Sequence, residues 1–174
     1  MKGGETTMEI IGKAHVFPVD NLNSDYIISG RYLGKAKIDD AIPHLFEELS
    51  PGFFDRFSPG DIILSGWNFG AGSTREHAPL LLKKSGIGAV VAKSFSRGFF
   101  RNGINLGLLL VETDWMNITD GDLVKINMEE GYLSIPEKEL SFKTRKLAGI
   151  AEEIHKSGGL LPYFKQHREQ FKIR

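Results

Sequence analysis

The chain is 174 residues long, contains no cysteine, and balances 22 lysines and arginines against 22 aspartates and glutamates. This balance excludes the broad basic face that binding to a nucleic-acid backbone requires. No apolar run approaches the ~20 residues of a membrane span. Without thiolates the chain forms no disulfide and holds no zinc or iron through cysteine, and its five scattered histidines lead us to expect no bound metal.

The length of the chain fits one domain with a sizeable core. We expect this domain to span residues 9–174, with residues 1–8 as a loose leader and Met8 as an alternative start. The N-terminus lacks the apolar segment of a secretion signal, so we expect a cytoplasmic protein.

Apolar runs and turn residues predict the elements of the first two thirds of the chain. In chain order they are a strand at 9–17, a polar loop at 18–37, a helix at 39–52, a strand at 61–66, a helix closed by Gly86, a strand at 87–94, a tight connection or short helix at 95–105 and an apolar strand at 106–112. Asp39 is the expected N-cap of the helix at 39–52, which would bury Leu45 and Phe46. Apolar strands joined by a helix are typical of parallel pairing with both faces covered.

The pattern changes after residue 118. Short strands are expected at 122–128, 132–135 and 140–143, with Glu129-Glu130-Gly131 as a hairpin turn. An amphipathic helix at 144–159 and a short final helix at 160–171 follow. The complete pattern indicates an α/β fold with a mixed sheet.

A glycine-rich stretch, "GWNFGAGSTREHAP" at residues 66–79, follows a predicted strand. Glycines at 66, 70 and 72 allow positive φ angles and bring backbone N–H groups close to a ligand. Ser73 and Glu76 have capping-box spacing, although Pro79 favours a helix that starts nearer Glu76. With the fork-shaped guanidinium of Arg75, the stretch predicts an anion site flanked by hydroxyl groups.

Other interpretations of this stretch remain open. It could be a plain strand-to-helix turn with a surface arginine. It could also be an NADP-type nucleotide-binding module, since Gly70 and Gly72 fit part of the dinucleotide fingerprint, but Arg75 stands where the third glycine belongs. The hydrolase pattern Gly-x-Ser-x-Gly is absent, because Gly72 directly precedes Ser73.

The segment "FGAGSTREHAP" resembles the aconitase superfamily, whose pattern here is Gly-x-Gly-Ser-Ser-Arg-Glu-His-Ala, with Thr74 in place of the second serine. The chain is most similar to the small subunits of 3-isopropylmalate dehydratases. Three further segments carry the likeness: "NSDYIISGRYL" at 23–33, "AKSFSRGFFRNGINLGLLLVE" at 92–112 and "EIHKSGGLLPYFK" at 153–165. The resemblance implies the swivelling β/β/α domain of that superfamily.

The resemblance also implies a hydro-lyase that isomerises a 2-alkylmalate by dehydration and rehydration. It places a [4Fe–4S] cluster on a large partner subunit, in agreement with the absence of cysteine here. It assigns Ser73 as the catalytic base and Asp25 as an active-site carboxylate, although an Asx-turn explains Asp25 equally well. Gly72, Thr74 and Arg75 are the implied substrate-binding residues, with Arg75 holding a carboxylate.

The resemblance places substrate specificity after Tyr32 and Leu33, where the family often has Arg-Thr and this chain has Gly34 and Lys35. Glycine leaves room for a branched alkyl group, and lysine can reach a distal carboxylate. The expected substrate is 3-isopropylmalate, in leucine biosynthesis. A 2,3-dimethylmalate dehydratase or homoaconitase type of enzyme is the alternative, and a scaffold that only grips a partner is a third hypothesis.

Overall fold

The computed structural model describes residues 9–34 and 37–171. The expected leader at 1–8 and the candidate Lys35 lie outside the described residues. Within these ranges no helix combines the length and the apolar character that crossing a bilayer requires.

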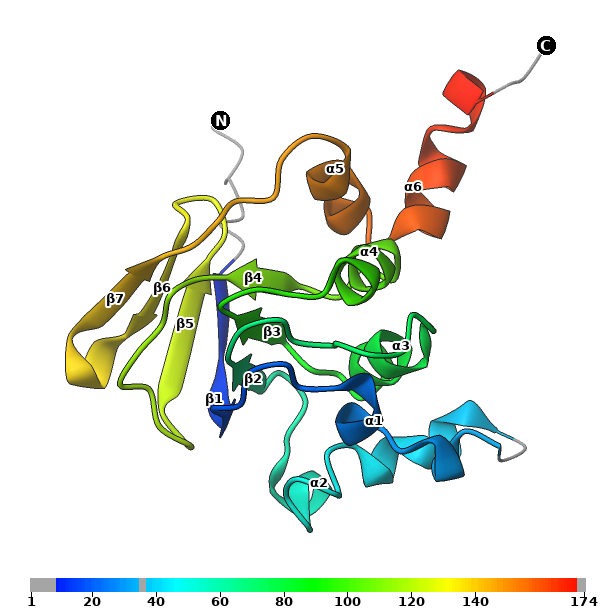
Figure 1. The fold of residues 1–174 in the computed structure, drawn as a ribbon. Coiled ribbons are helices and arrows are strands. Elements are labelled where there is room, and N and C mark those ends of the chain that lie inside the picture. Colours follow the sequence, from blue (N-terminus) through cyan, green and yellow to red (C-terminus); the bar gives the residue numbers. More distant parts are fainter. Residues whose placement is uncertain (1–8, 35–36, 172–174) are drawn as a thin grey trace.

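Seven strands form one mixed sheet in the order β4-β3-β2-β1-β5-β6-β7 (Figure 1). Their bounds are β1 Glu9–Phe17, β2 Ile62–Ser65, β3 Ala89–Ala92, β4 Leu110–Glu112, β5 Leu123–Asn127, β6 Tyr132–Ile135 and β7 Leu140–Lys143. Strands β1 to β4 are parallel, whereas β5, β6 and β7 are antiparallel to their neighbours. The predicted mixed sheet, and the parallel pairing of its apolar strands, are confirmed.

Strand β1 belongs to both halves of the sheet. Its second half pairs with β2, with Ala14 opposite Ile62, and its first half pairs with β5, with Ile10 opposite Ile126. Gly12 lies two residues before the first pair with β2, and a Cβ there would lie 2.2 Å from the carbonyl oxygen of Gly60. A glycine therefore permits the close approach of the chain at which β1 changes partner.

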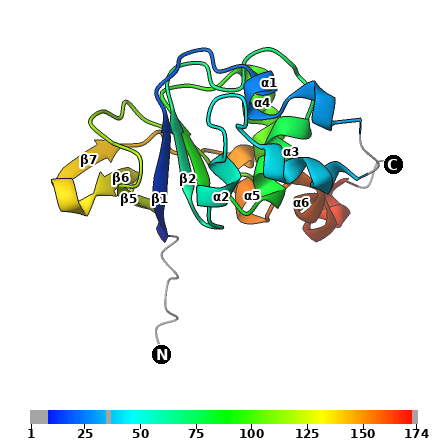
Figure 2. The ribbon, with the colours of Figure 1, turned by 90° about the horizontal axis from the view of Figure 1, so that it is seen from below.

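Helices cover one face of the parallel strands, and the antiparallel strands curl over the other (Figure 2). The helical segments are α1 Ser24–Ile27, η1 Gly30–Tyr32, η2 Ile38–His44, α2 Phe53–Arg56, α3 His77–Lys84, α4 Arg97–Asn105, η3 Pro136–Lys138, α5 Ile150–Lys156, α6 Leu160–Gln166 and η4 Arg168–Phe171. Side chains alternate between the faces, so Ile63 packs under the helices while Ile62 and Leu64 pack against β5 and β6. The resulting three layers match the expected β/β/α arrangement.

The predicted helix at 39–52 is wrong. A 3-10 helix ends at His44, and Phe46 takes a left-handed conformation with φ 55°, which no α-helix accommodates. Pro43 also removes a backbone donor there. Leu45 and Phe46 are nevertheless buried, so the apolar spacing identified core residues but not the backbone path.

Other boundaries also differ from the sequence predictions. The strand expected at 106–112 begins only at Leu110, after Gly107 at φ 71°. The helix expected at 144–159 begins only at Ile150, after Gly149 at φ 61°, and ends before Gly158. The polar loop expected at 18–37 contains α1 and η1, and it buries Ile27 and Ile28.

Candidate functional site

The glycine-rich segment lies beyond the carboxyl ends of β1 and β2, where parallel sheets place their ligand sites. It runs beside the chain that leaves β1. The amide of Gly70 donates to the carbonyl of Leu22 over 2.9 Å, and the amide of Ser24 donates to the carbonyl of Ala71 over 2.8 Å. Two segments that are about fifty residues apart in the sequence are thereby joined at one edge of the sheet.

A small hollow of about 40 Å³ lies between these segments and is called here the Ser73 hollow. Its lining residues are Ser24, Asp25, Ile28, Gly30, Leu33, Ser73, Arg75, His77 and Ala78. It brings four of the predicted site residues together: Ser73, Arg75, Asp25 and Leu33. Ligand pockets commonly reach about 300–1,000 Å³, so this hollow alone does not enclose a dicarboxylic acid.

Ser73 is exposed, and its hydroxyl oxygen accepts a hydrogen bond from the amide of Arg75 over 3.2 Å. Its own amide donates to the hydroxyl oxygen of Ser24 over 3.2 Å. The expected capping box is not formed, because Glu76 is the N-cap residue of α3 and makes no side-chain capping bond. The start of the helix near Glu76 is confirmed, and its first turn borders the hollow through His77 and Ala78.

The predicted positive φ angles occur at Gly70, with φ 76°, and at Gly72, with φ 89°, but not at Gly66. Both positions also lack space for a side chain. A Cβ on Gly70 would lie 2.3 Å from the ring of Phe99, and one on Gly72 would lie 2.6 Å from the amide group of Asn23. The glycines therefore serve close packing of the loop as well as its backbone conformation.

Helix α4 supports the same loop from the other side. Ser96, the N-cap residue of α4, donates its hydroxyl hydrogen to the carbonyl of Gly70 over 2.7 Å. The side chain of Asn102 donates to the carbonyl of Thr74 over 2.9 Å. Thr74 is exposed and does not line the Ser73 hollow, and Gly72 lies next to the hollow without lining it.

Asp25 lies in the first turn of α1, and its exposed side chain lines the hollow. An Asx-turn is present, but Asn23 makes it: the side-chain oxygen of Asn23 accepts from the amide of Asp25 over 2.9 Å. The carboxylate of Asp25 is therefore not the acceptor of that turn.

The segment expected to determine specificity is only partly at the hollow. Leu33 lines it, whereas Gly34 is exposed and is not among the lining residues. The ring of Tyr32 stacks on His44 with ring centroids 3.8 Å apart, and its hydroxyl donates to Glu47. This hydrogen bond lowers the pKa of Glu47 and raises that of Tyr32. Tyr32 thus anchors the segment rather than lining the hollow.

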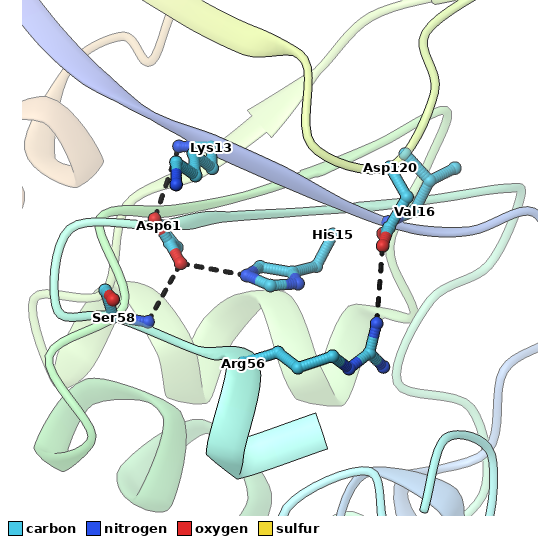
Figure 3. Close-up of polar contacts among 7 residues, drawn as sticks. All are labelled: Lys13, His15, Val16, Arg56, Ser58, Asp61 and Asp120. Atoms are coloured by element: carbon cyan, nitrogen blue, oxygen red, sulfur yellow. Dashed lines mark hydrogen bonds and ion pairs between the residues drawn. The ribbon is translucent and has the colours of Figure 1, made fainter. Parts of the chain in front are cut away.

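A second polar cluster was not anticipated from the sequence (Figure 3). The Nε2 atom of buried His15 lies 2.9 Å from the carboxylate of Asp61, which also accepts from the amides of Ser58 and Lys13 over 2.9 and 3.3 Å. His15 lies on β1 and Asp61 directly precedes β2, so the cluster connects β1 to the amino-terminal end of β2, away from the glycine-rich segment that follows the carboxyl end of β2. No three acidic or histidine side chains are grouped to hold a metal ion in the described part of the chain.

Comparison with known proteins places this geometry in context. Residues 52–115 match the family model of the aconitase C-terminal domain. The 3-isopropylmalate dehydratase small subunit of Halothermothrix orenii is 42% identical over 150 residues, covering 84% of this chain and 90% of the relative. Small subunit 1 of the same dehydratase from Archaeoglobus fulgidus is 41% identical over 163 residues, covering 92% and 99%.

A crystal structure of 3-isopropylmalate dehydratase (leuD) from Methanocaldococcus jannaschii superposes with a TM-score of 0.89. The two sequences are 37% identical, and the match covers 94% of this chain and 97% of the other. The likeness therefore extends well beyond the glycine-rich segment to the whole three-layer arrangement.

Proposed function

Because the chain belongs to the family of 3-isopropylmalate dehydratase small subunits, we propose that it is the small subunit of a hydro-lyase that isomerises a 2-alkylmalate by dehydration and rehydration. The substrate proposed is 3-isopropylmalate, in leucine biosynthesis. Support comes from relatives about 40% identical over nearly their full length. Within the chain, the observation that carries the proposal is the meeting of Ser73, Arg75 and Asp25 at one hollow.

In this proposal, Ser73 removes the proton from the carbon next to a substrate carboxylate and returns a proton in the reverse step. A serine alkoxide is unfavourable at neutral pH, so the site must stabilise negative charge on the oxygen. The amide of Arg75 already donates to that oxygen, and such a bond strengthens when the acceptor is charged. The serine is therefore placed in a geometry that favours its basic form.

Arg75 is proposed to bind a substrate carboxylate, because its guanidinium matches the two carboxylate oxygens and its side chain lines the same hollow. Asp25 faces the hollow from the other segment and is proposed to orient the substrate hydroxyl or a water molecule. The apolar side chains of Leu33 and Ile28 offer a surface for a branched alkyl group. Gly72 and Thr74 are proposed to contribute through the backbone shape of the loop.

The proposed partner is a large subunit that carries the [4Fe–4S] cluster which the family resemblance implies. The residues of this chain do not fit such a cluster, because the chain contains no cysteine. The small volume of the Ser73 hollow agrees with a site whose remaining walls come from another chain. A nucleotide-binding module is less well supported, since the amide of Ser73 is already bound to Ser24 and a carboxylate borders the hollow.

The test is reconstitution of isomerase activity with the large subunit encoded in the same genome. The wild-type chain should restore turnover of 3-isopropylmalate, and Ser73→Ala should lower kcat by about 1,000-fold or more at unchanged complex affinity. Ser141→Ala, which alters an exposed serine of β7, is the matched control and should retain activity. Full activity of Ser73→Ala in an intact complex would remove Ser73 as the base. Full activity of Arg75→Ala would favour a scaffold role instead.

A further inference from the structure

Ser24 connects the two segments that form the Ser73 hollow. It is 4% exposed, although its neighbours Asp25 and Ser73 are exposed. Its amide donates to the carbonyl of Ala71 over 2.8 Å, and its hydroxyl oxygen accepts from the amide of Ser73 over 3.2 Å. One residue thus holds the glycine-rich segment at two positions on either side of Gly72.

The hydroxyl of Ser24 is also oriented from the other side. Its hydrogen points to the side-chain oxygen of Asn23 in a long contact of 3.4 Å, and that oxygen accepts from the amide of Asp25 over 2.9 Å. With the hydrogen directed to Asn23, a lone pair of the Ser24 oxygen is available to Ser73. A continuous set of contacts therefore runs from Asp25 through Asn23 and Ser24 to Ser73.

The conformation of the segment requires such external support. Gly72 at φ 89° has no side chain of its own to restrict the φ and ψ rotations that orient the peptide unit leading to Ser73. Ser73 and Arg75 are exposed and do not fix the loop by burial. The hydrogen bond that the Ser73 amide donates to Ser24 therefore helps to set the orientation of the Ser73 peptide, while the Ser73 oxygen accepts from the amide of Arg75.

We propose that Ser24 is a positioning residue for catalysis: its buried hydroxyl fixes the peptide of Ser73 so that the Ser73 oxygen faces the reacting carbon. This inference rests on the proposed function. It assigns no contact between Ser24 and the substrate. Since an error of about 1 Å in the placement of a catalytic group can cost about 100-fold in rate, loss of this hydroxyl should reduce kcat rather than substrate affinity.

The experiment compares Ser24→Ala, Ser24→Val and Ser24→Thr in the reconstituted complex. Valine and threonine have the same shape, so their difference isolates the hydroxyl. Ser24→Ala and Ser24→Val should lower kcat by about 10- to 100-fold, with KM and the affinity for the large subunit unchanged, and Ser24→Thr should stay within about threefold of the wild type. Hydrogen exchange of the Ser73 amide in the isolated chain should speed up in Ser24→Ala and Ser24→Val.

Thr113→Val is the matched control, because it removes a buried hydroxyl that donates to the carbonyl of Lys143 over 2.9 Å, away from the hollow. It should lower the melting temperature without lowering kcat. Wild-type kcat in Ser24→Ala and Ser24→Val, or a loss that Thr113→Val reproduces, would overturn the positioning role. If Ser24→Thr does not fold, the comparison of kcat between Ser24→Ala and Thr113→Val decides whether Ser24 has a positioning role. Failure of the wild-type chain itself to support turnover would instead overturn the proposed function, and the inference with it.

Discussion

The parallel and the antiparallel half of the sheet differ in how their strands are connected. In the antiparallel half, β5, β6 and β7 follow one another through short turns and pair along most of their length. In the parallel half, the chain must cross back after each strand to the end of the sheet where the next strand begins. Long connections therefore leave from the carboxyl ends of the strands. All of the candidate site residues that the structure describes belong to those connections.

The halves also differ in how their backbone groups are satisfied. Strand ladders bind the backbone of β5 to β7, whereas the glycine-rich segment combines a few backbone bonds to neighbouring loops with side-chain bonds from Ser24, Ser96 and Asn102. The sheet therefore depends on many similar contacts, and the site depends on a few individual ones. Substitutions in the antiparallel half should therefore lower stability without lowering kcat. Substitutions of the side chains that hold the glycine-rich segment should lower kcat.

The largest stability effect should come from Gly70, where the glycine-rich segment packs directly against the core residue Phe99. Gly70→Ala places a methyl group 2.3 to 2.5 Å from side-chain atoms of Phe99 at a φ of 76°. Overpacking together with the left-handed backbone should lower the free energy of unfolding by about 4 kcal/mol, measured by urea denaturation. Gly121→Ala is the control, because its φ is 88° but nothing lies within 4 Å, so its cost should be only about 1 kcal/mol. Equal costs at the two glycines would show that the contact with Phe99 contributes little.

A smaller loss, with a different consequence, is expected in the antiparallel half. Leu133 on β6 is fully buried between the layers, and Leu133→Ala should lower the free energy of unfolding by about 3 kcal/mol. At a temperature where the variant remains folded, kcat of the reconstituted complex should equal that of the wild type. A fall in kcat at full occupancy of the complex would contradict the separation of the two halves.

Much of the fold could be predicted because it depends on local patterns. Fully apolar runs identified β2, β3 and β4, and the hairpin turn before Tyr132 separated β5 from β6. The helix at 39–52 failed because apolar spacing reports which side chains are buried and not the φ angles between them. The left-handed Phe46 breaks the helix within a sequence whose pattern is otherwise helical.

The site could be predicted only where its residues are contiguous. Ser73 and Arg75 stand in one motif, so the sequence placed them together, and family resemblance supplied Asp25. The support that Ser24 and Ser96 give to the loop was not recognised, because Ser24 reaches Ser73 across 49 positions and Ser96 reaches Gly70 across 26. Small polar residues such as these most often cap turns, so their types alone gave no signal of a role at the site.

The smallest effect expected is a pH dependence of stability that arises at α5, away from the glycine-rich segment. Burial, reinforced by repulsion from Lys83, lowers the pKa of His155 on α5, and its Nδ1 atom is buried without a partner among the described residues. His155 lines a pocket together with the charged residues Glu129, Lys146, Glu152 and Lys156. In the unfolded chain, where a histidine has its ordinary pKa of about 6.5, His155 binds a proton at pH values at which it stays neutral in the folded chain. Stability should therefore decrease as the pH falls below about 6.5, down to the lower folded pKa.

His155→Gln should flatten the free energy of unfolding between pH 7 and pH 5, measured by urea denaturation at each pH, while the kcat of the reconstituted complex at pH 7 stays unchanged. Lys83→Met tests the repulsion, since it should raise the pKa of His155 toward its ordinary value in an NMR titration. A pKa of His155 at or above its ordinary value in the wild type would show that protonation does not oppose the packing of α5. The pH dependence would then have to come from carboxylates such as Glu47, whose lowered pKa makes its contribution disappear only in more acidic solution.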